Sequence, residues 1–177
     1  MNNKYLLAIT LIIIATLCRI YQPIYNFAPV IAIGLFSGYI FRQKNMAIII
    51  TLLASFVGDM LISYINKYPL FHNSFVFVYL SYILITLFGN KLNNSKLEWN
   101  KVAIFGISSS LLFFIITNFG VWLMDSIYTK NISGLIECFI AAIPFYKNSF
   151  ISDLIYIPLI FGSYTILAQR KMLSIKL

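Results

Sequence analysis

The stretch Lys101-Val-Ala-Ile-Phe-Gly-Ile-Ser-Ser-Ser-Leu-Leu-Phe-Phe-Ile-Ile-Thr-Asn-Phe-Gly-Val-Trp-Leu123 decides the fold class of this chain. It carries a single charge, at its first residue. Trp99 and Trp122 stand about 34 Å apart along an ideal helix, and tryptophan gathers at the two headgroup layers of a bilayer. The stretch therefore predicts a helix that crosses a membrane.

The rest of the chain repeats this pattern. Apolar residues make up 60% of the 177 residues and charged residues only 10%, which is typical of a protein dissolved in a bilayer. Short loops that carry lysine or arginine separate the apolar runs. We expect an all-α integral membrane protein with one membrane domain over residues 1–177. Its six transmembrane helices are expected at about residues 5–21, 27–41, 46–65, 74–90, 101–123 and 150–168.

Two segments depart from this regular pattern. The second apolar run, 27–41, is short and contains Pro29, Gly34 and Gly38, which suits a tilted helix packed closely against a neighbour. The segment 132–145 is too short to cross a bilayer comfortably. We expect it to form an interfacial or re-entrant helix that ends at Pro144, because proline breaks the hydrogen-bond pattern of a helix.

Positive charges predict the orientation of the bundle. With six crossings and a cytoplasmic N-terminus, nine of the 13 lysines and arginines fall on the cytoplasmic side. The four that fall outside are Arg19, Lys67, Lys130 and Lys147. This bias predicts that both termini are cytoplasmic. It also accounts for the net charge of +8, and no basic and aromatic polar face indicates a nucleic-acid partner.

Polar side chains inside the apolar runs are the strongest sign of function. A charged residue at the middle of a bilayer costs about 2.5–3.5 kcal/mol on insertion scales, so it needs a compensating role. We expect Arg19 at the outer end of the first helix and Asp59 about 9 Å below the outer end of the third. Asp153 falls in the first turn of the sixth expected helix, and Asn118 stands one turn before Trp122. All of them are expected in the outer half of the bundle, as a polar pocket open to the outside.

Each of these residues also has a purely structural interpretation. Asp59 would pair with Arg19, Asp153 would complement the positive end of its helix, and Asn118 would bond to a neighbouring helix. The residues alone leave the structural and functional interpretations open, and the two can coexist. Aromatic residues expected at the same level, such as Phe114, suit either an interface belt or a pocket that stacks on a flat solute.

Catalysis and metal binding find little support in the sequence. No zinc-protease, nucleophile-elbow or phosphate-loop motif is present, and the single histidine, His72, falls in a loop. Carboxylate chemistry by Asp59 and Asp153 is the one catalytic scheme left, and we do not expect an enzyme. Cys18 and Cys138 suggest neither a disulfide framework nor a metal cluster, so no metal or cofactor is expected.

Several short strings occur together in this chain. They are Asn26-Phe-Ala-Pro29, Ser55-Phe-Val-Gly-Asp59, Asn118-Phe-Gly-Val-Trp122 and Ala141-Ala-Ile-Pro144-Phe145-Tyr-Lys-Asn148, with Arg19 before them and Asp153 after them. Over roughly residues 17–165 this set resembles an uncharacterised bacterial family of transport-type proteins. That family is in turn similar to the substrate-binding S components of energy-coupling-factor (ECF) vitamin transporters.

The resemblance implies a bundle of six transmembrane helices in the bacterial inner membrane, with a solute site near the extracellular face. It also implies docking onto a membrane coupling subunit that two cytoplasmic ATPases drive. S components often carry an Ala-x-x-x-Ala surface on their first helix for this docking. In this chain Ala8 and Ala15 are seven residues apart, and the motif is absent.

Two functional hypotheses of different classes follow. In the first, the protein captures a small solute of the vitamin or micronutrient class from outside, through Arg19, Asn26, Asp59, Asn118, Trp122 and Asp153. In the second, it is a non-transporting membrane scaffold similar to the rod-shape-determining protein that resembles S components, and its polar cluster holds helices together. An unassisted carrier or channel is a third possibility, which uptake into liposomes without an ATPase would indicate.

Overall fold

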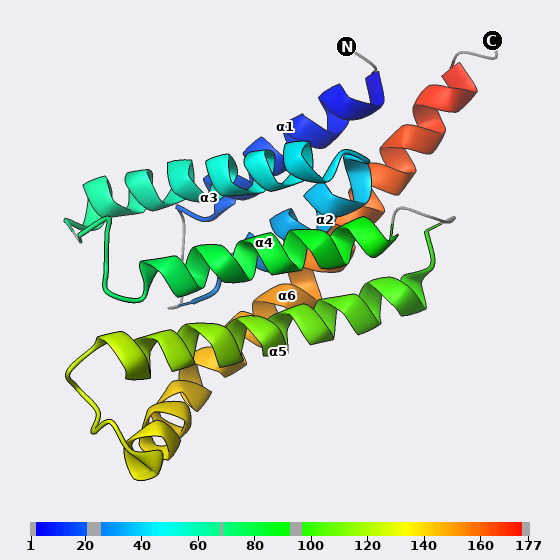
Figure 1. Ribbon diagram of the computed structural model, residues 1–177. Helices are drawn as coiled ribbons and strands as arrows, with labels where there is room; N and C mark the ends of the chain where they lie inside the picture. Colours follow the sequence, from blue (N-terminus) through cyan, green and yellow to red (C-terminus); the bar gives the residue numbers. More distant parts are fainter. Residues whose placement is uncertain (1–2, 21–25, 68, 93–96, 175–177) are drawn as a thin grey trace.

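The described part of the protein is a bundle of six helices, seen in a computed structural model that covers residues 3–20, 26–67, 69–92 and 97–174 (Figure 1). The helices are α1 (Asn3–Cys18), α2 (Val30–Ile40), α3 (Lys44–Asn66), α4 (Phe75–Leu92), α5 (Trp99–Met124) and α6 (Ile132–Ser174). No strand occurs within these residues, so the protein is all-helical there, as the sequence predicts. One end of the bundle, which we call the hollow end, holds the last turns of α1, α3 and α5 and the first turns of α2 and α4.

Four helices are long and apolar enough to cross a membrane: α3, α4, α5 and α6 as far as Ala168. Their outward faces carry large apolar side chains such as Leu53, Ile104 and Leu159, each more than half exposed. Lipid would cover such faces, because soluble proteins do not leave so much contiguous apolar surface in water. The protein therefore has the character of a membrane protein. The helices α1 and α2 are shorter than a membrane crossing requires.

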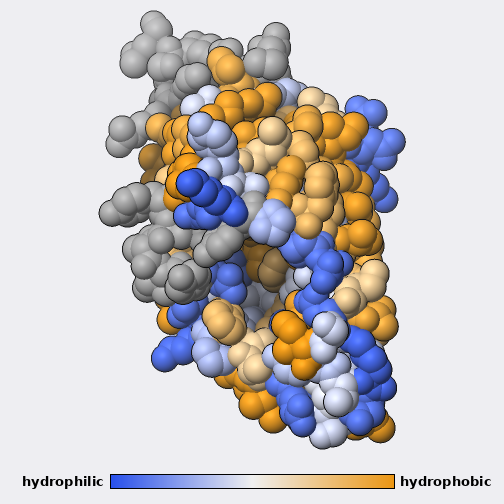
Figure 2. All heavy atoms as spheres, turned by 90° about the vertical axis from the view of Figure 1, so that its left-hand side faces the viewer, coloured by the Kyte–Doolittle hydropathy of each residue, from blue (hydrophilic) through white to orange (hydrophobic). Residues whose placement is uncertain are grey.

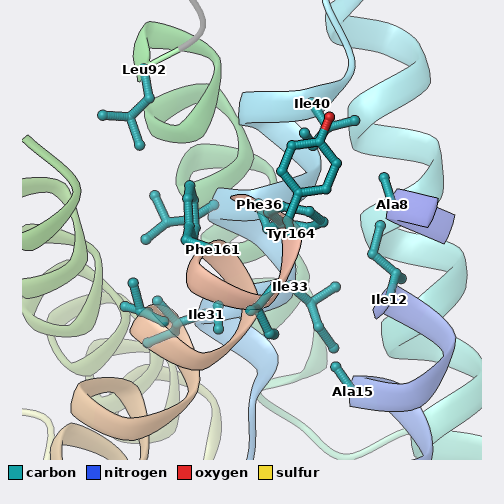
Figure 3. Close-up of a cluster of buried hydrophobic side chains, with 14 of the residues drawn as sticks. Ala8, Ile12, Ala15, Ile31, Ile33, Phe36, Ile40, Leu92, Phe161 and Tyr164 are labelled. Atoms are coloured by element: carbon teal, nitrogen blue, oxygen red, sulfur yellow. The ribbon is translucent and has the colours of Figure 1, made fainter. Parts of the chain in front are cut away.

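Helix α2 occupies the centre of the bundle. It has 11 residues and is about 16 Å long, so it cannot cross a hydrocarbon core of about 30 Å. All of its residues except Tyr39 are buried, and it contacts each of the other five helices. Phe36 packs edge-on against Phe161 and Tyr164 of α6, with ring centres 5.3 Å apart in both cases (Figure 3). The tilted transmembrane helix expected at 27–41 is thus a short core helix.

Two glycines bring α2 and α4 into backbone contact. A methyl group on Gly38 would lie 2.0 Å from the carbonyl oxygen of Thr86, and one on Gly89 would lie 2.1 Å from that of Leu35. Both clashes involve backbone atoms, so no side chain fits at either position. The amide of Asn90 also donates to the carbonyls of Gly38 and Phe41, at 3.1 Å each. The close packing expected from the glycines of α2 is therefore with α4.

Helix α6 corrects one expectation. A single helix of 43 residues, with Pro144 and Pro158 inside it, replaces the expected interfacial helix at 132–145 and the crossing helix at 150–168. The prediction that Pro144 ends a helix is therefore wrong. Proline removes one hydrogen bond from a helix, but helices in a membrane tolerate it because neighbouring groups satisfy the freed carbonyl. Asp153 consequently lies near the middle of α6 and not in the first turn of a helix.

Candidate functional site

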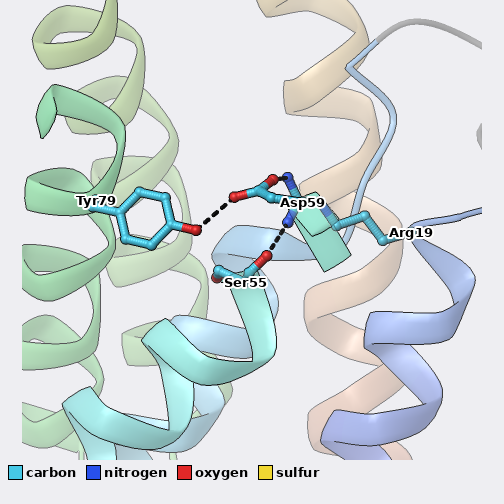
Figure 4. Close-up of polar contacts among 4 residues, drawn as sticks. All are labelled: Arg19, Ser55, Asp59 and Tyr79. Carbon is cyan, nitrogen blue, oxygen red and sulfur yellow. Dashed lines mark hydrogen bonds and ion pairs between the residues drawn. The ribbon is translucent and has the colours of Figure 1, made fainter. Parts of the chain in front are cut away.

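An ion pair joins α1 to α3 at the hollow end. Arg19 directly follows α1; its Nη2 pairs with Asp59 of α3, and its Nη1 donates to the carbonyl of Ser55 at 2.9 Å (Figure 4). Tyr79 of α4 donates its hydroxyl to the second carboxylate oxygen of Asp59 at 2.7 Å. One pair of opposite charges and one phenol therefore hold three helices together.

The surroundings of this pair explain its stability. The side chains of Arg19 and Asp59 are only 11% and 21% exposed, so each charge depends on the other for compensation. A methyl group on Gly58 would lie 3.0 Å from Nη1 of Arg19, so the absence of a side chain there lets the guanidinium lie along α3. Asp59 is thus held behind Arg19 as its counter-ion.

A cavity of about 140 Å³ opens beside Arg19 and extends to Asp153, and we call it the Arg19–Asp153 cavity. Helices α4 and α5 supply aromatic walls, Tyr82 and Phe113, whose rings stack with centres 5.7 Å apart. The start of α2 forms another wall. The described lining residues are Arg19, Asn26, Ala28, Val30, Ile31, Tyr82, Phe113, Ser149 and Asp153. A cavity of this size admits several water molecules or a fragment of a few heavy atoms.

A second cavity of about 140 Å³, the Asn118 cavity, adjoins the first and lies between α5 and α6. The two share three lining residues, Asn26, Phe113 and Ser149. Its other described lining residues are Ser110, Phe114, Thr117, Asn118, Ala142, Phe145 and Tyr146. From the hollow end the molecule shows a central depression with hydrophilic residues on its rim (Figure 2).

Asp153 is the most unusual residue of the Arg19–Asp153 cavity. It is 4% exposed, and its Oδ2 has no hydrogen-bond partner in the described structure. On the neighbouring helix α5, Ser110 is 2% exposed, and its hydroxyl lies near this carboxyl without forming a well-aligned hydrogen bond. A buried carboxyl with an unused oxygen is costly, because burial removes the hydrogen bonds that water supplied.

The loop before α2 is fixed against α6. Asn26 has a left-handed backbone with φ of 61°, a conformation that asparagine adopts more readily than most residues. Ser149 donates its hydroxyl to the carbonyl of Asn26 at 3.2 Å, and Ser152 donates to that of Ala28 at 3.0 Å. These two bonds from α6 place the side chain of Asn26 on both cavities.

The structure brings together four of the six residues proposed from the sequence. Arg19, Asn26 and Asp153 line the Arg19–Asp153 cavity, and Asn118 lines the Asn118 cavity. The amide of Asn118 donates to the carbonyl of Phe114, one turn earlier in α5, at 2.7 Å. The amide of Asn118 therefore bonds within its own helix, not to a neighbouring one.

The other two proposed residues lie outside both cavities. Asp59 is the counter-ion of Arg19, as described above. Trp122 lines neither cavity, and its indole nitrogen donates to the carbonyl of Thr129 at 2.9 Å. The Nζ atom of Lys130 lies 5.9 Å from the centre of the indole ring of Trp122. Trp122 thus fixes the turn after α5.

Sequence reasoning missed several residues of the site. Tyr79 holds Asp59, and Tyr82, Ser110 and Ser149 line the cavities. None of them is unusual in a chain with 12 tyrosines, because tyrosine and serine occur in transmembrane helices for many reasons. The one available signal was the spacing of Tyr79 and Tyr82, which places both on one face of a helix.

A third cavity, of about 170 Å³, lies between α5 and α6 on their outer side. Its walls are almost entirely apolar, and Ile107 and Leu154 on its rim are about half exposed. Asp153 is its only ionisable lining residue among the described ones, so this carboxyl separates the apolar groove from the Arg19–Asp153 cavity.

The described residues offer no ready metal site. No group of three or more histidine, cysteine, aspartate or glutamate side chains comes together among them. Cys18 and Cys138 are both free thiols, and Cys138 is buried. The described lining of the two adjoining cavities offers one carboxyl, one compensated guanidinium, amides, hydroxyls and aromatic rings.

Comparison with known families matches residues 1–175 to one described only as a family of unknown function, DUF6580. The chain belongs to the DUF6580 family. No curated protein and no solved structure matches the chain. Membership in DUF6580 brings no activity with it, and these comparisons do not show the expected similarity to S components.

Proposed function

We propose that the protein is a substrate-binding membrane protein of the S-component type, which takes a small solute from outside into the Arg19–Asp153 and Asn118 cavities. The observation that carries this proposal is the buried carboxyl of Asp153, whose Oδ2 has no partner and which borders a cavity. Arg19, Asn26 and Asn118 supply further polar groups around the same space. The two cavities adjoin one another and measure about 140 Å³ each, so they suit a small solute of the vitamin or micronutrient class.

A scaffold function accounts for only part of this arrangement. The network of Arg19, Asp59 and Tyr79 does hold helices together, as a scaffold requires. The carboxyl of Asp153 and the hydroxyl of Ser110 lie near one another, but neither forms a well-aligned hydrogen bond that would join the two helices. Polar groups kept for structure alone are expected to be paired, because an unpaired one destabilises the fold. The unused groups at the cavity therefore favour solute binding.

Energy for transport would have to come from a partner. The sequence has no phosphate-loop motif, so an energy-coupling subunit with its ATPases is the partner proposed here. The first helix does not offer the alanine surface that S components use for docking. Ala8, Ile12 and Ala15 share one face of α1, and all are buried against the bundle (Figure 3). Docking would therefore use a different surface of the protein.

A co-purifying solute is the direct test of this function. Native mass spectrometry of the full-length protein in detergent should show a bound small molecule. Ser110→Ala should lower the occupied fraction about two- to tenfold, because it removes a hydroxyl that faces the Asn118 cavity. Ser109→Ala is the matched control, since Ser109 is the adjacent buried serine with an unused hydroxyl, and it lines neither cavity.

The outcome separates the two function classes. Loss of occupancy in the Ser110 variant alone would support solute binding in these cavities. Equal occupancy in both variants would place the solute elsewhere. A protein that retains no solute, and that no compound stabilises against heat, would favour the scaffold.

A further inference from the structure

The charges around the cavities are balanced only while the carboxyl of Asp153 is neutral. Arg19 is the one positively charged residue among the described lining residues, and Asp59 already compensates it. Two of its nitrogens donate to Asp59 and to the carbonyl of Ser55. Asp153 forms no ion pair within the described residues. Taken together, Arg19, Asp59 and an ionised Asp153 leave one negative charge without a partner.

An unpaired negative charge at this depth needs compensation. Asp153 lies near the middle of α6, and it lines the apolar groove together with Ile107, which falls near the middle of α5. An ionised carboxylate inside a membrane is costly unless a cation or several hydrogen-bond donors accompany it. A positively charged group on the solute would supply both, because an ammonium is a charge and a donor at once.

The walls of the cavities also suit a cation. Tyr82 and Phe113 line the Arg19–Asp153 cavity, together with Asp153, and their rings are stacked 13° from parallel. Phe114, Phe145 and Tyr146 line the adjoining Asn118 cavity. Aromatic faces attract organic cations through the ring quadrupole, by about 0.5–2 kcal/mol for each favourable contact. Rings and one carboxylate together form a common binding site for amines.

An anionic solute fits less well. The start of α2 lines the cavity at Val30 and Ile31, and a helix N-terminus favours negative charge. An anion that bound there would have to share a small cavity with Asp153 and to compete with Asp59 for Arg19. Both effects oppose it, because like charges repel strongly where water is scarce.

We propose that the solute is a small organic cation, an amine or a protonated ring nitrogen, with Asp153 as its counter-ion and Tyr82 and Phe113 against its positive group. This inference rests on the proposed solute-binding function and narrows it to one class of substrate. The amides of Asn26 and Asn118 would then bond to polar groups on the remainder of the solute.

Three probes of equal size and different charge test this inference. They are benzylamine, which is positively charged at neutral pH, the neutral benzyl alcohol, and the negatively charged benzoate. Their dissociation constants are measured by ligand-observed NMR on the full-length protein in detergent, with empty micelles as the blank. We expect benzylamine to bind about tenfold or more tightly than either of the others, as a charged hydrogen bond predicts.

Substitutions test whether the preference for benzylamine depends on the Arg19–Asp153 cavity. Asp153→Asn keeps the size of the side chain and should remove the tenfold preference, with an unfolding temperature close to that of the parent protein. Phe113→Leu should weaken the binding of benzylamine about fivefold, because it removes one aromatic ring from the cavity wall. Asp125→Asn is the matched control, because Asp125 is a carboxylate at the hollow end that lines none of the three cavities, and it should leave all three affinities unchanged.

Other outcomes overturn the inference. Tightest binding of benzoate, equal binding of the three probes, or no binding of benzylamine would each exclude a cation site at Asp153. If Asp153→Asn still preferred benzylamine, a cation site at Asp153 would likewise be excluded. A solute that co-purifies and depends on Ser110 would preserve the proposed function in each of these cases, so the two proposals can fail separately.

Discussion

Arg19 and Asp59 illustrate at the scale of single residues how a membrane protein accommodates charge. Replacement of Asp59 by leucine would leave the guanidinium of Arg19 buried without its counter-ion. We expect the free energy of unfolding to fall by about 3–5 kcal/mol, the cost typical of a broken buried ion pair. Thermal or denaturant unfolding in detergent measures this change.

A second substitution checks the cause. Arg19→Met combined with Asp59→Leu removes both charges, and it should recover much of the lost stability. The exposed pair of Glu98 and Lys101, with Nζ 2.8 Å from Oε1, is the control, and Glu98→Ala should cost only about 0–1 kcal/mol. A double variant no more stable than Asp59→Leu alone would show that this pair is not what stabilises the hollow end.

The residue scale is also where the sequence was most informative about the site. A charge inside an apolar run needs a reason, so Arg19, Asp59 and Asp153 could be identified without coordinates. Their roles could not be separated, because pairing depends on which helices are neighbours. The structure pairs Asp59 with Arg19 and leaves an oxygen of Asp153 free. Tyr82 was missed because burial beside a cavity leaves no mark on a tyrosine in the sequence.

At the scale of helices, the contact between α2 and α4 depends on the absence of side chains. Gly38→Ala would place a methyl group 2.0 Å from the carbonyl oxygen of Thr86. The two helices would have to separate, so we expect a loss of at least about 1–3 kcal/mol in unfolding free energy. The measurement is again unfolding in detergent.

Gly162→Ala is the matched control for that experiment. Its methyl group would lie 3.8 Å from the ring of Trp99, an ordinary contact, so no loss of stability is expected. Similar losses in both variants would mean that α2 and α4 are not packed backbone to backbone.

Helices α2 and α6 show what apolar patterns leave undetermined. Hydropathy finds an apolar helix, but a helix covered by lipid and one covered by other helices are equally apolar. The run 27–41 therefore gave no sign that residues 30–40 form a central core helix. The sequence alone predicts a helix end at Pro144 for a related reason: the effect of a proline depends on what surrounds its helix, and α6 continues through it.

At the scale of the whole molecule, solute capture from outside requires that the hollow end face away from the cytoplasm. The distribution of lysine and arginine predicts this orientation. In a variant whose two native cysteines are replaced, Ile127→Cys lies in the exposed turn between α5 and α6 at the hollow end. A membrane-impermeant thiol reagent should label it in intact cells. Asn100→Cys, at the exposed start of α5, should react only after the membrane is permeabilised. The reverse pattern would direct the cavities toward the cytoplasm, and the protein would then be loaded from inside the cell.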